Sequence, residues 1–261
     1  MSIKTILVVV SGEVGYLSRL DMAFALATKY NSTVITLYIR EPSFVYIDGH
    51  SKNLNSSIIE IQENQIESHS IQVKSETVSR AAKSQIPIEW RYDDGDETTI
   101  AILHARYCDL IISSPHTAKN FLFNAGVPLI VVPAGSVCVV PHNMLIAWNG
   151  SREAALAIHN AIPLLNDAKS VTALYFDAPN NFKSNANFTA HFAGHGIDVE
   201  LKMLLSNGQS IGSLIIKEAV LNMDDMIVMG GYGHSRFNEW ILGSVTEEMI
   251  YNSPIPLFVS H

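Results

Sequence analysis

The chain has 261 residues, 48% of them apolar, and a formal net charge of −8. This length allows one large core or two of ordinary size and favours two domains. The acidic balance argues against a nucleic-acid surface, and no stretch approaches the roughly 20 apolar residues that span a bilayer. The start does not resemble a signal peptide, so we expect a cytoplasmic protein with no nucleic-acid or membrane partner, in which Cys108 and Cys138 are free thiols.

The first half alternates short apolar strands with helical periods. Strands are predicted at 6–10, 34–39, 86–92, 109–113 and 128–133, and helices at 18–30, 54–83 and 98–107. The pattern assigns no helix between the last two strands. Because the central strands lack polar alternation, helices are expected on both faces of a parallel sheet.

A linker at 133–141, with proline at both ends, leads to the second half. Strands are predicted there at 144–148, 171–176, 198–205, 225–229 and 256–260, and helices at 151–165, 185–195, 210–221 and 239–252. Elements of the two halves superimpose at an offset of 137 to 138 residues. The sequence therefore predicts two tandem repeats of one doubly wound α/β domain, at 1–136 and 142–261.

A glycine-rich run follows the strand at 225–229 and leads into a helix. It contains Gly230, Gly233 and, after nine further residues, Gly243 followed by Ser244. This spacing is neither that of the P-loop nor that of the dinucleotide fingerprint. Glycines let backbone amides approach an anion, and a helix N-terminus adds partial positive charge. The run is therefore either a phosphate loop or a connector between strand and helix.

The first repeat offers an internal comparison for this run. From Asp109 to Pro128 is 19 residues, whereas the equivalent distance from Asp225 to Pro256 is 31, so 12 residues are missing. The remnant at 113–120 contains no glycine. Because the fold can close without the run, its presence in the second repeat favours a nucleotide loop over a connector.

Three segments of the second repeat resemble those of tandem-type bacterial universal stress proteins, the UspA family. They are Ile146 to Ala154, the glycine-rich run, and Pro254 to His261, and the likeness extends over nearly the whole chain. The resemblance implies two five-stranded parallel, Rossmann-like domains of strand order 3-2-1-4-5, packed as an intramolecular pseudo-dimer. It also implies ATP, alone or with Mg²⁺, at the carboxyl ends of strands one and four of the second repeat.

The same resemblance assigns roles within the glycine-rich run. Gly230 and Gly233 would approach the ribose and phosphates, while Gly243, Ser244 and the amide of Val245 would hold the β- and γ-phosphates. Ser244 is equally suited to cap the following helix. His234 and Arg236 either offset phosphate charge or line a solvated loop face.

Residues outside the run complete the expected site. Asn149 stands where ATP-binding members usually carry Asp near the adenine, so phosphate binding is better supported than adenine specificity. Ala147 lies in the same strand and belongs to the same expected site. The backbone of Phe176 is expected to meet adenine while its side chain joins the core.

No catalytic residue and no metal site are predicted. No Gly-x-Ser-x-Gly is present, and the acids of the run, Glu239 and Glu247, suit the surface, so at most slow ATP hydrolysis is expected. His191 and His195 are four residues apart, but no carboxylate or cysteine completes a ligand set near them. Asp224 and Asp225 are expected in a surface turn at the amino end of a strand.

The predicted function is ATP binding in a stress-response or regulatory protein that forms a homodimer. Two alternatives from other classes stay open. One is a nucleotide-free interaction module that works through its repeat or dimer surface. The other is a small-molecule enzyme that uses the cleft between the repeats.

Overall fold

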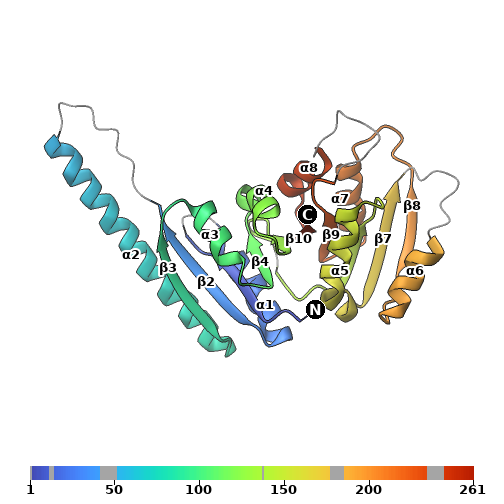
Figure 1. Ribbon diagram of the computed structural model, residues 1–261, viewed down its shortest axis with the longest axis horizontal. Coiled ribbons are helices and arrows are strands. Elements are labelled where there is room, and N and C mark those ends of the chain that lie inside the picture. The colour runs from blue at the N-terminus through green and yellow to red at the C-terminus, as the bar shows by residue number, and fades with distance from the viewer. Residues whose placement is uncertain (1, 12–14, 42–51, 137, 177–184, 234–243) are drawn as a thin grey trace.

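A computed structural model describes residues 2–11, 15–41, 52–136, 138–176, 185–233 and 244–261 (Figure 1). The first repeat contains β1 (Thr5–Val9), α1 (Tyr16–Tyr30), β2 (Thr33–Arg40), α2 (Lys52–Ser84), β3 (Ile88–Asp94), α3 (Glu97–Ala105), β4 (Leu110–Ser113), α4 (Pro115–Asn124) and β5 (Leu129–Val131). The second contains β6 (Asn143–Ala147), α5 (Arg152–Asp167), β7 (Ser170–Phe176), α6 (Asn185–Gly194), β8 (Glu200–Leu204), α7 (Ile211–Leu221), β9 (Met226–Gly230), α8 (Ser244–Asn252) and β10 (Leu257–Ser260).

The strands form a single 10-stranded sheet in the order β3-β2-β1-β4-β5-β10-β9-β6-β7-β8. Within each repeat the strand pairs are parallel and the order is 3-2-1-4-5, as the resemblance implied. The repeats meet where β5 and β10 pair antiparallel, with Ile130 opposite Phe258. The fifth strands thus join the two repeats, and β3 and β8 form the outer edges of the sheet (Figure 1).

Helices cover both faces of this sheet. Ile6 and Val8 of β1 belong to the core that packs against α1, α2, α5 and α6. Leu7 and Val9 of the same strand belong to the core under α3, α4, α7 and α8. Since successive side chains of a strand point to opposite faces, both sets must be apolar. This arrangement explains the continuous apolar strands of the sequence and confirms the predicted doubly wound class.

Helix α2 confirms the helix predicted in the polar segment at 54–83. Its 33 residues include the buried Val73 and Ala81, which pack against the sheet, and the exposed Ile61 and Ile71. In Figure 1 the helix lies along the β3 edge and extends past the sheet. Of the helices in the described ranges, including α2, none combines the length and apolarity needed to cross a membrane.

Helix α4 is the main difference from the sequence-based expectation, which assigned no helix between the fourth and fifth strands. Ala118, Phe121 and Leu122 are buried against the sheet and hold the helix in place. Pro115 is its first residue, where the missing N–H would have no helical partner in any case. Only Ser114 separates β4 from α4, whereas residues 231–243 separate β9 from α8. The first repeat therefore lacks the loop but keeps the helix.

Two aspartates fasten the amino ends of neighbouring strands in the same way in both repeats. Asp225 Oδ2 accepts hydrogen bonds from the backbone N–H groups of His142 and Asn143, both at 2.9 Å. Asp109 Oδ2 accepts from those of Lys4 and Thr5 at 2.8 and 2.9 Å. These aspartates are structural. Asp224, expected in a surface turn, is instead buried with 8% of its surface exposed.

Candidate functional site

The predicted site lies where the strand order of the second repeat reverses. β6 pairs with β7 on one side and β9 on the other, so that Ala147 lies opposite both Leu174 and Met229. Open parallel sheets bind ligands outside the carboxyl ends of their strands at such a point. The fold therefore brings the end of β6 and the start of the glycine-rich run together.

The turn from β6 into α5 presents a helix N-terminus at this edge. Asn149 is exposed, and its Oδ1 accepts a hydrogen bond from the Ser151 backbone N–H at 3.0 Å. Gly150 adopts a left-handed φ of 74°. Ser151 Oγ caps α5 by accepting from the Ala154 N–H at 3.1 Å. The Asn149 amide nitrogen takes no part in the Ser151 bond, and the helix end adds partial positive charge.

Gly230 is required by packing between strand and helix. A Cβ at this position would lie 2.4 Å from the backbone nitrogen of Ala154 and 2.6 Å from the carbonyl carbon of Glu153. Both atoms are backbone of α5 and cannot move aside cheaply. The glycine thus lets β9 meet the start of α5, whether or not a ligand is bound.

Gly233 faces side chains of α5 rather than its backbone. A Cβ here would lie 2.7 Å from Glu153 Oε2 and 3.2 Å from Ser151 Oγ. Glu153 is only 8% exposed, and its Oε1 lies 3.7 Å from Nη1 of the exposed Arg152. A carboxylate therefore adjoins the glycine-rich run. It opposes a bare phosphate and favours a cation.

The two described ends of the run are fastened together. The Tyr232 backbone N–H donates to Thr246 Oγ1 in the first turn of α8 at 3.0 Å, and Gly231 N–H donates to the Ser260 carbonyl at 2.8 Å. Ser244 begins α8, and the Val245 side chain packs against the core. The site residues Gly243, His234 and Arg236 lie outside the described residues.

Tyr232 is supported from the first repeat. It has a left-handed φ of 49°, which is uncommon for a bulky residue. Its ring lies 4.8 Å from that of Phe123 in α4, and Lys119 Nζ lies 5.6 Å from the Tyr232 ring centre. Lys119 also forms an ion pair of 2.7 Å with Glu247 of α8. Burial and the Glu247 charge raise the pKa of the Tyr232 hydroxyl.

The remaining predicted residues line the strand ends. Ala147 and Phe176 are partly buried and pack against the core beneath α7 and α8, as expected for the Phe176 side chain. Sequence reasoning missed Glu153, Thr246 and Phe123. Glu153 could have been found from its place in the first turn after a strand. Thr246 and Phe123 carry no local signal, because their partners are distant in sequence.

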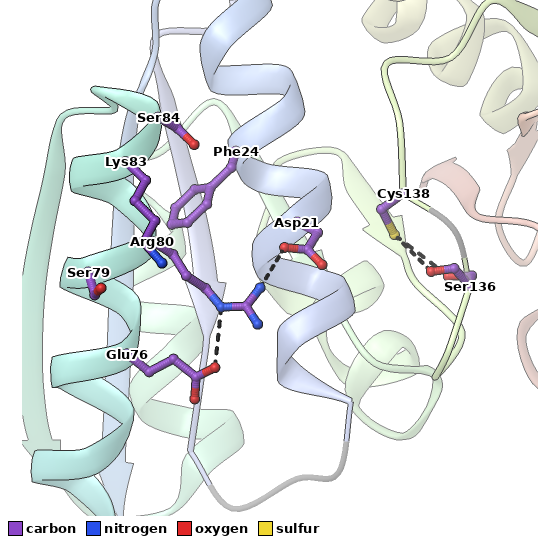
Figure 2. Close-up of a pocket in the computed structure, with 9 residues that line it drawn as sticks. All are labelled: Asp21, Phe24, Glu76, Ser79, Arg80, Lys83, Ser84, Ser136 and Cys138. Atoms are coloured by element: carbon purple, nitrogen blue, oxygen red, sulfur yellow. Dashed lines mark hydrogen bonds and ion pairs between the residues drawn. The ribbon is translucent and has the colours of Figure 1, made fainter.

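A pocket of about 810 Å³ lies in the first repeat between α1, α2 and the linker (Figure 2). Arg80 bridges Asp21 at 3.1 Å and Glu76 at 3.2 Å, which ties α2 to α1. Lys83 balances the second of the two acids, so the charged lining is neutral. Burial raises the pKa of the Cys138 thiol at the other wall, which disfavours a reactive thiolate. No sequence motif points to this pocket.

Comparisons with known proteins place the chain in a family. Residues 189–261 match the family model described as the universal stress protein family. No protein with a curated description matches the chain in sequence. A universal stress protein from Archaeoglobus fulgidus DSM 4304 has a similar structure, with a TM-score of 0.77, 15% identity, and coverage of 98% of this chain and 97% of that one.

Two structures from Pseudomonas aeruginosa are also similar over nearly the full length. A protein of strain UCBPP-PA14, described as a universal stress protein, has a TM-score of 0.58, 17% identity, and coverage of 99% of this chain and 93% of that one. A protein of unknown function from strain PAO1 has a TM-score of 0.56, 16% identity, and coverage of 99% and 92%. The chain thus belongs to the universal stress protein family, with the sequence match in its second repeat and the family fold in both.

Proposed function

We propose that the second repeat binds an adenine nucleotide, ATP with Mg²⁺, at the carboxyl ends of β6 and β9, and that the protein acts in stress response or its regulation. In this proposal the units are 1–136 and 142–261, and the first unit holds no nucleotide. The chain works in the cytoplasm and hydrolyses ATP slowly at most.

One observation carries the proposal. The bond between the Tyr232 N–H and Thr246 Oγ1 closes the glycine-rich run into a loop at the switch point of the sheet. The first turns of α5 and α8 both begin at this edge, so two helix N-termini supply amide donors. The first repeat has the same sheet but only Ser114 in place of the loop. A connector needs no such length, whereas a triphosphate does.

The residues at the site fit a nucleotide that carries a metal ion better than a bare one. Glu153 places a carboxylate beside Gly233, and such a charge disfavours phosphate oxygens unless a cation offsets it. Mg²⁺ prefers carboxylate and phosphate oxygens and keeps several waters. Glu153 is the described carboxylate nearest the loop that could face such an ion, directly or through water. When bound, Mg²⁺ would neutralise phosphate charge.

The test compares the intact protein with two glycine variants. We expect adenine nucleotide to leave the purified protein on denaturation, and calorimetry with ATP and Mg²⁺ to show a single site per chain. Gly233→Val places a branched side chain against Glu153 and Ser151 and should weaken binding by at least about tenfold, which is 1.4 kcal/mol. Gly194→Val is the control, because an added Cβ there meets nothing within 4 Å.

Gly230 is not used for this test, since its substitution would disturb the backbone of α5. If the purified protein carries no nucleotide and calorimetry detects no ATP binding, the proposal fails. The nucleotide-free interaction module then becomes the better interpretation, and Gly233→Val should leave partner binding unchanged. Equal losses in Gly233→Val and Gly194→Val would indicate a general loss of fold rather than a site.

We also propose that two chains associate as a homodimer. The fifth strands already pair within the chain, so β3 and β8 are the sheet edges left for a partner. β8 carries the exposed Met203, and the exposed Leu205 directly follows it. Sedimentation equilibrium would test this assembly, and a monomer at all concentrations would contradict it.

A further inference from the structure

Three histidines gather on the surface of the second repeat. His191 lies on α6, His195 directly follows that helix, and His159 lies on α5. The ring centres of His191 and His195 are 4.9 Å apart, and those of His159 and His191 are 5.2 Å apart. The sequence alone suggests only the pair four residues apart. The fold adds the third ring from a helix more than thirty positions earlier in the chain.

The helices beneath these rings are firmly packed. Phe188 and Phe192 of α6 are 7% and 0% exposed and belong to the same core as Ile158 of α5. Phe188 also lies 5.0 Å from the ring of Trp148. The three histidines are exposed above this core. Their backbone positions are therefore fixed, whereas their rings can turn.

The proton arrangement of His159 can be derived from its partner. Its Nδ1 lies 2.7 Å from the carbonyl oxygen of Ala155. A carbonyl only accepts, so Nδ1 carries the proton and Nε2 keeps a free lone pair. This backbone bond is the kind that orients metal-bound imidazoles. Burial and the adjacent His159 and His195 lower the pKa of His191, which favours the neutral, ligating form.

The ring separations suit coordination by imidazole. With a metal–nitrogen distance of about 2.0–2.1 Å and a tetrahedral angle, the centres of two bound rings lie about 5 Å apart. Both observed separations are close to this value. Within the described part of the chain, no three such side chains already surround a common metal position. Rotation of exposed rings is thus required, and it is inexpensive at the surface.

We propose that His159, His191 and His195 bind a divalent transition-metal ion, for which Zn²⁺ is the reference. Each imidazole supplies one nitrogen lone pair, and water completes a tetrahedral set. The carboxyl end of α6 adds a favourable interaction with the cation. The ion links α5 to α6 and so joins the helix that begins at the candidate nucleotide site to its neighbour.

The experiment uses the full chain without an affinity tag, treated with a chelator and then freed of it. Zn²⁺ is titrated by calorimetry in the absence of nucleotide, so the result does not depend on the proposed function. We expect saturation at one ion per chain and a rise in the thermal midpoint. His191→Ala should weaken binding by at least about tenfold, because even loss of an outer partner of a ligand costs that much.

His142→Ala is the control, since His142 is an exposed histidine at the amino end of β6. It should bind Zn²⁺ as the wild type does. Co²⁺ in place of Zn²⁺ should give the visible bands of a tetrahedral site, and His191→Ala should lose them. His195→Ala provides a second variant if His191→Ala unfolds. Unchanged Zn²⁺ affinity in a folded His191→Ala or His195→Ala variant, or unsaturable binding to the wild type, would overturn the proposal.

Discussion

At the scale of single residues, Glu153 is the group that most affects the proposed site. Its carboxylate adjoins Gly233, so it repels phosphate when no cation is present. We expect Glu153→Gln to bind ATP roughly tenfold more tightly than the wild type in EDTA, since a nearby unit charge is worth about 1–4 kcal/mol at 4 Å. Excess Mg²⁺ should remove this gain. Calorimetry under both conditions measures it.

The control for this prediction is Glu200→Gln on β8, where the side chain is 65% exposed. This variant should bind ATP as the wild type does under both conditions. An equal affinity of Glu153→Gln and the wild type in EDTA would mean that the carboxylate does not face the nucleotide.

Asp224 predicts a pH-dependent stability. Burial raises the pKa of its carboxyl to about 6, and Oδ2 has no hydrogen-bond partner among the described residues. Because the folded-state pKa lies above the ordinary value of 3.8, stability is greatest below pH 4 and is lost as the pH rises through about 6. Asp224→Asn should therefore be more stable than the wild type by about 1–2 kcal/mol at pH 8.

This difference should vanish towards pH 4, where Asp224 is protonated in both states. Urea unfolding of the wild type and the variant at several pH values measures it. A difference that stays constant with pH would show that the charge of Asp224 carries no such cost. Asp225 is unsuitable for this comparison, because it holds the start of β6 through two backbone bonds.

At the scale of elements, α4 shows what the degenerate first repeat contributes. It has lost its own loop, and its helix supports the loop of the second repeat through Phe123 and Lys119. Phe123 also lies edge-on to His261, whose Nδ1 is 2.9 Å from the Gly231 carbonyl. The first repeat thus positions the loop without binding the ligand itself.

We expect Phe123→Ala to weaken ATP binding by about two- to tenfold, since an aromatic pair contributes roughly 0.5–1.5 kcal/mol. The matched control is Tyr251→Ala on α8, which occupies the corresponding place and lies 6.3 Å from His116 of α4. Tyr251 meets no loop on the first repeat, so its loss should leave ATP affinity unchanged. Equal effects of the two variants on calorimetric affinity would argue against a specific role of α4.

At the scale of the whole molecule, the β5–β10 pair makes one cooperative unit of two repeats. Ile130 and Phe258 lie opposite each other and are 0% and 1% exposed. We expect a single calorimetric unfolding transition, and Ile130→Ala should lower it as a whole by about 2–5 kcal/mol of stability. A variant that splits the transition, with only one half destabilised, would show that the repeats unfold independently.

Much of this architecture could be predicted because it depends on local patterns. The strands were found within a few residues, since a strand covered on both faces must be apolar throughout. Helix α4 was missed because the segment was interpreted through its missing glycines, although Pro115 and the buried Ala118, Phe121 and Leu122 have helical spacing. The predicted nucleotide residues that are described do lie near the ends of β6, β7 and β9 or in the first turn of α8.

By itself the sequence determined the repeat, the doubly wound class and the loss of one loop, because each follows from residue order and hydrophobic pattern. Tertiary structure alone decided that β5 joins β10, that Glu153 adjoins Gly233, that Phe123 supports Tyr232, and that His159 meets His191. Each of these is a contact between segments far apart in the chain. Such contacts depend on how helices and strands pack together, which no local pattern encodes.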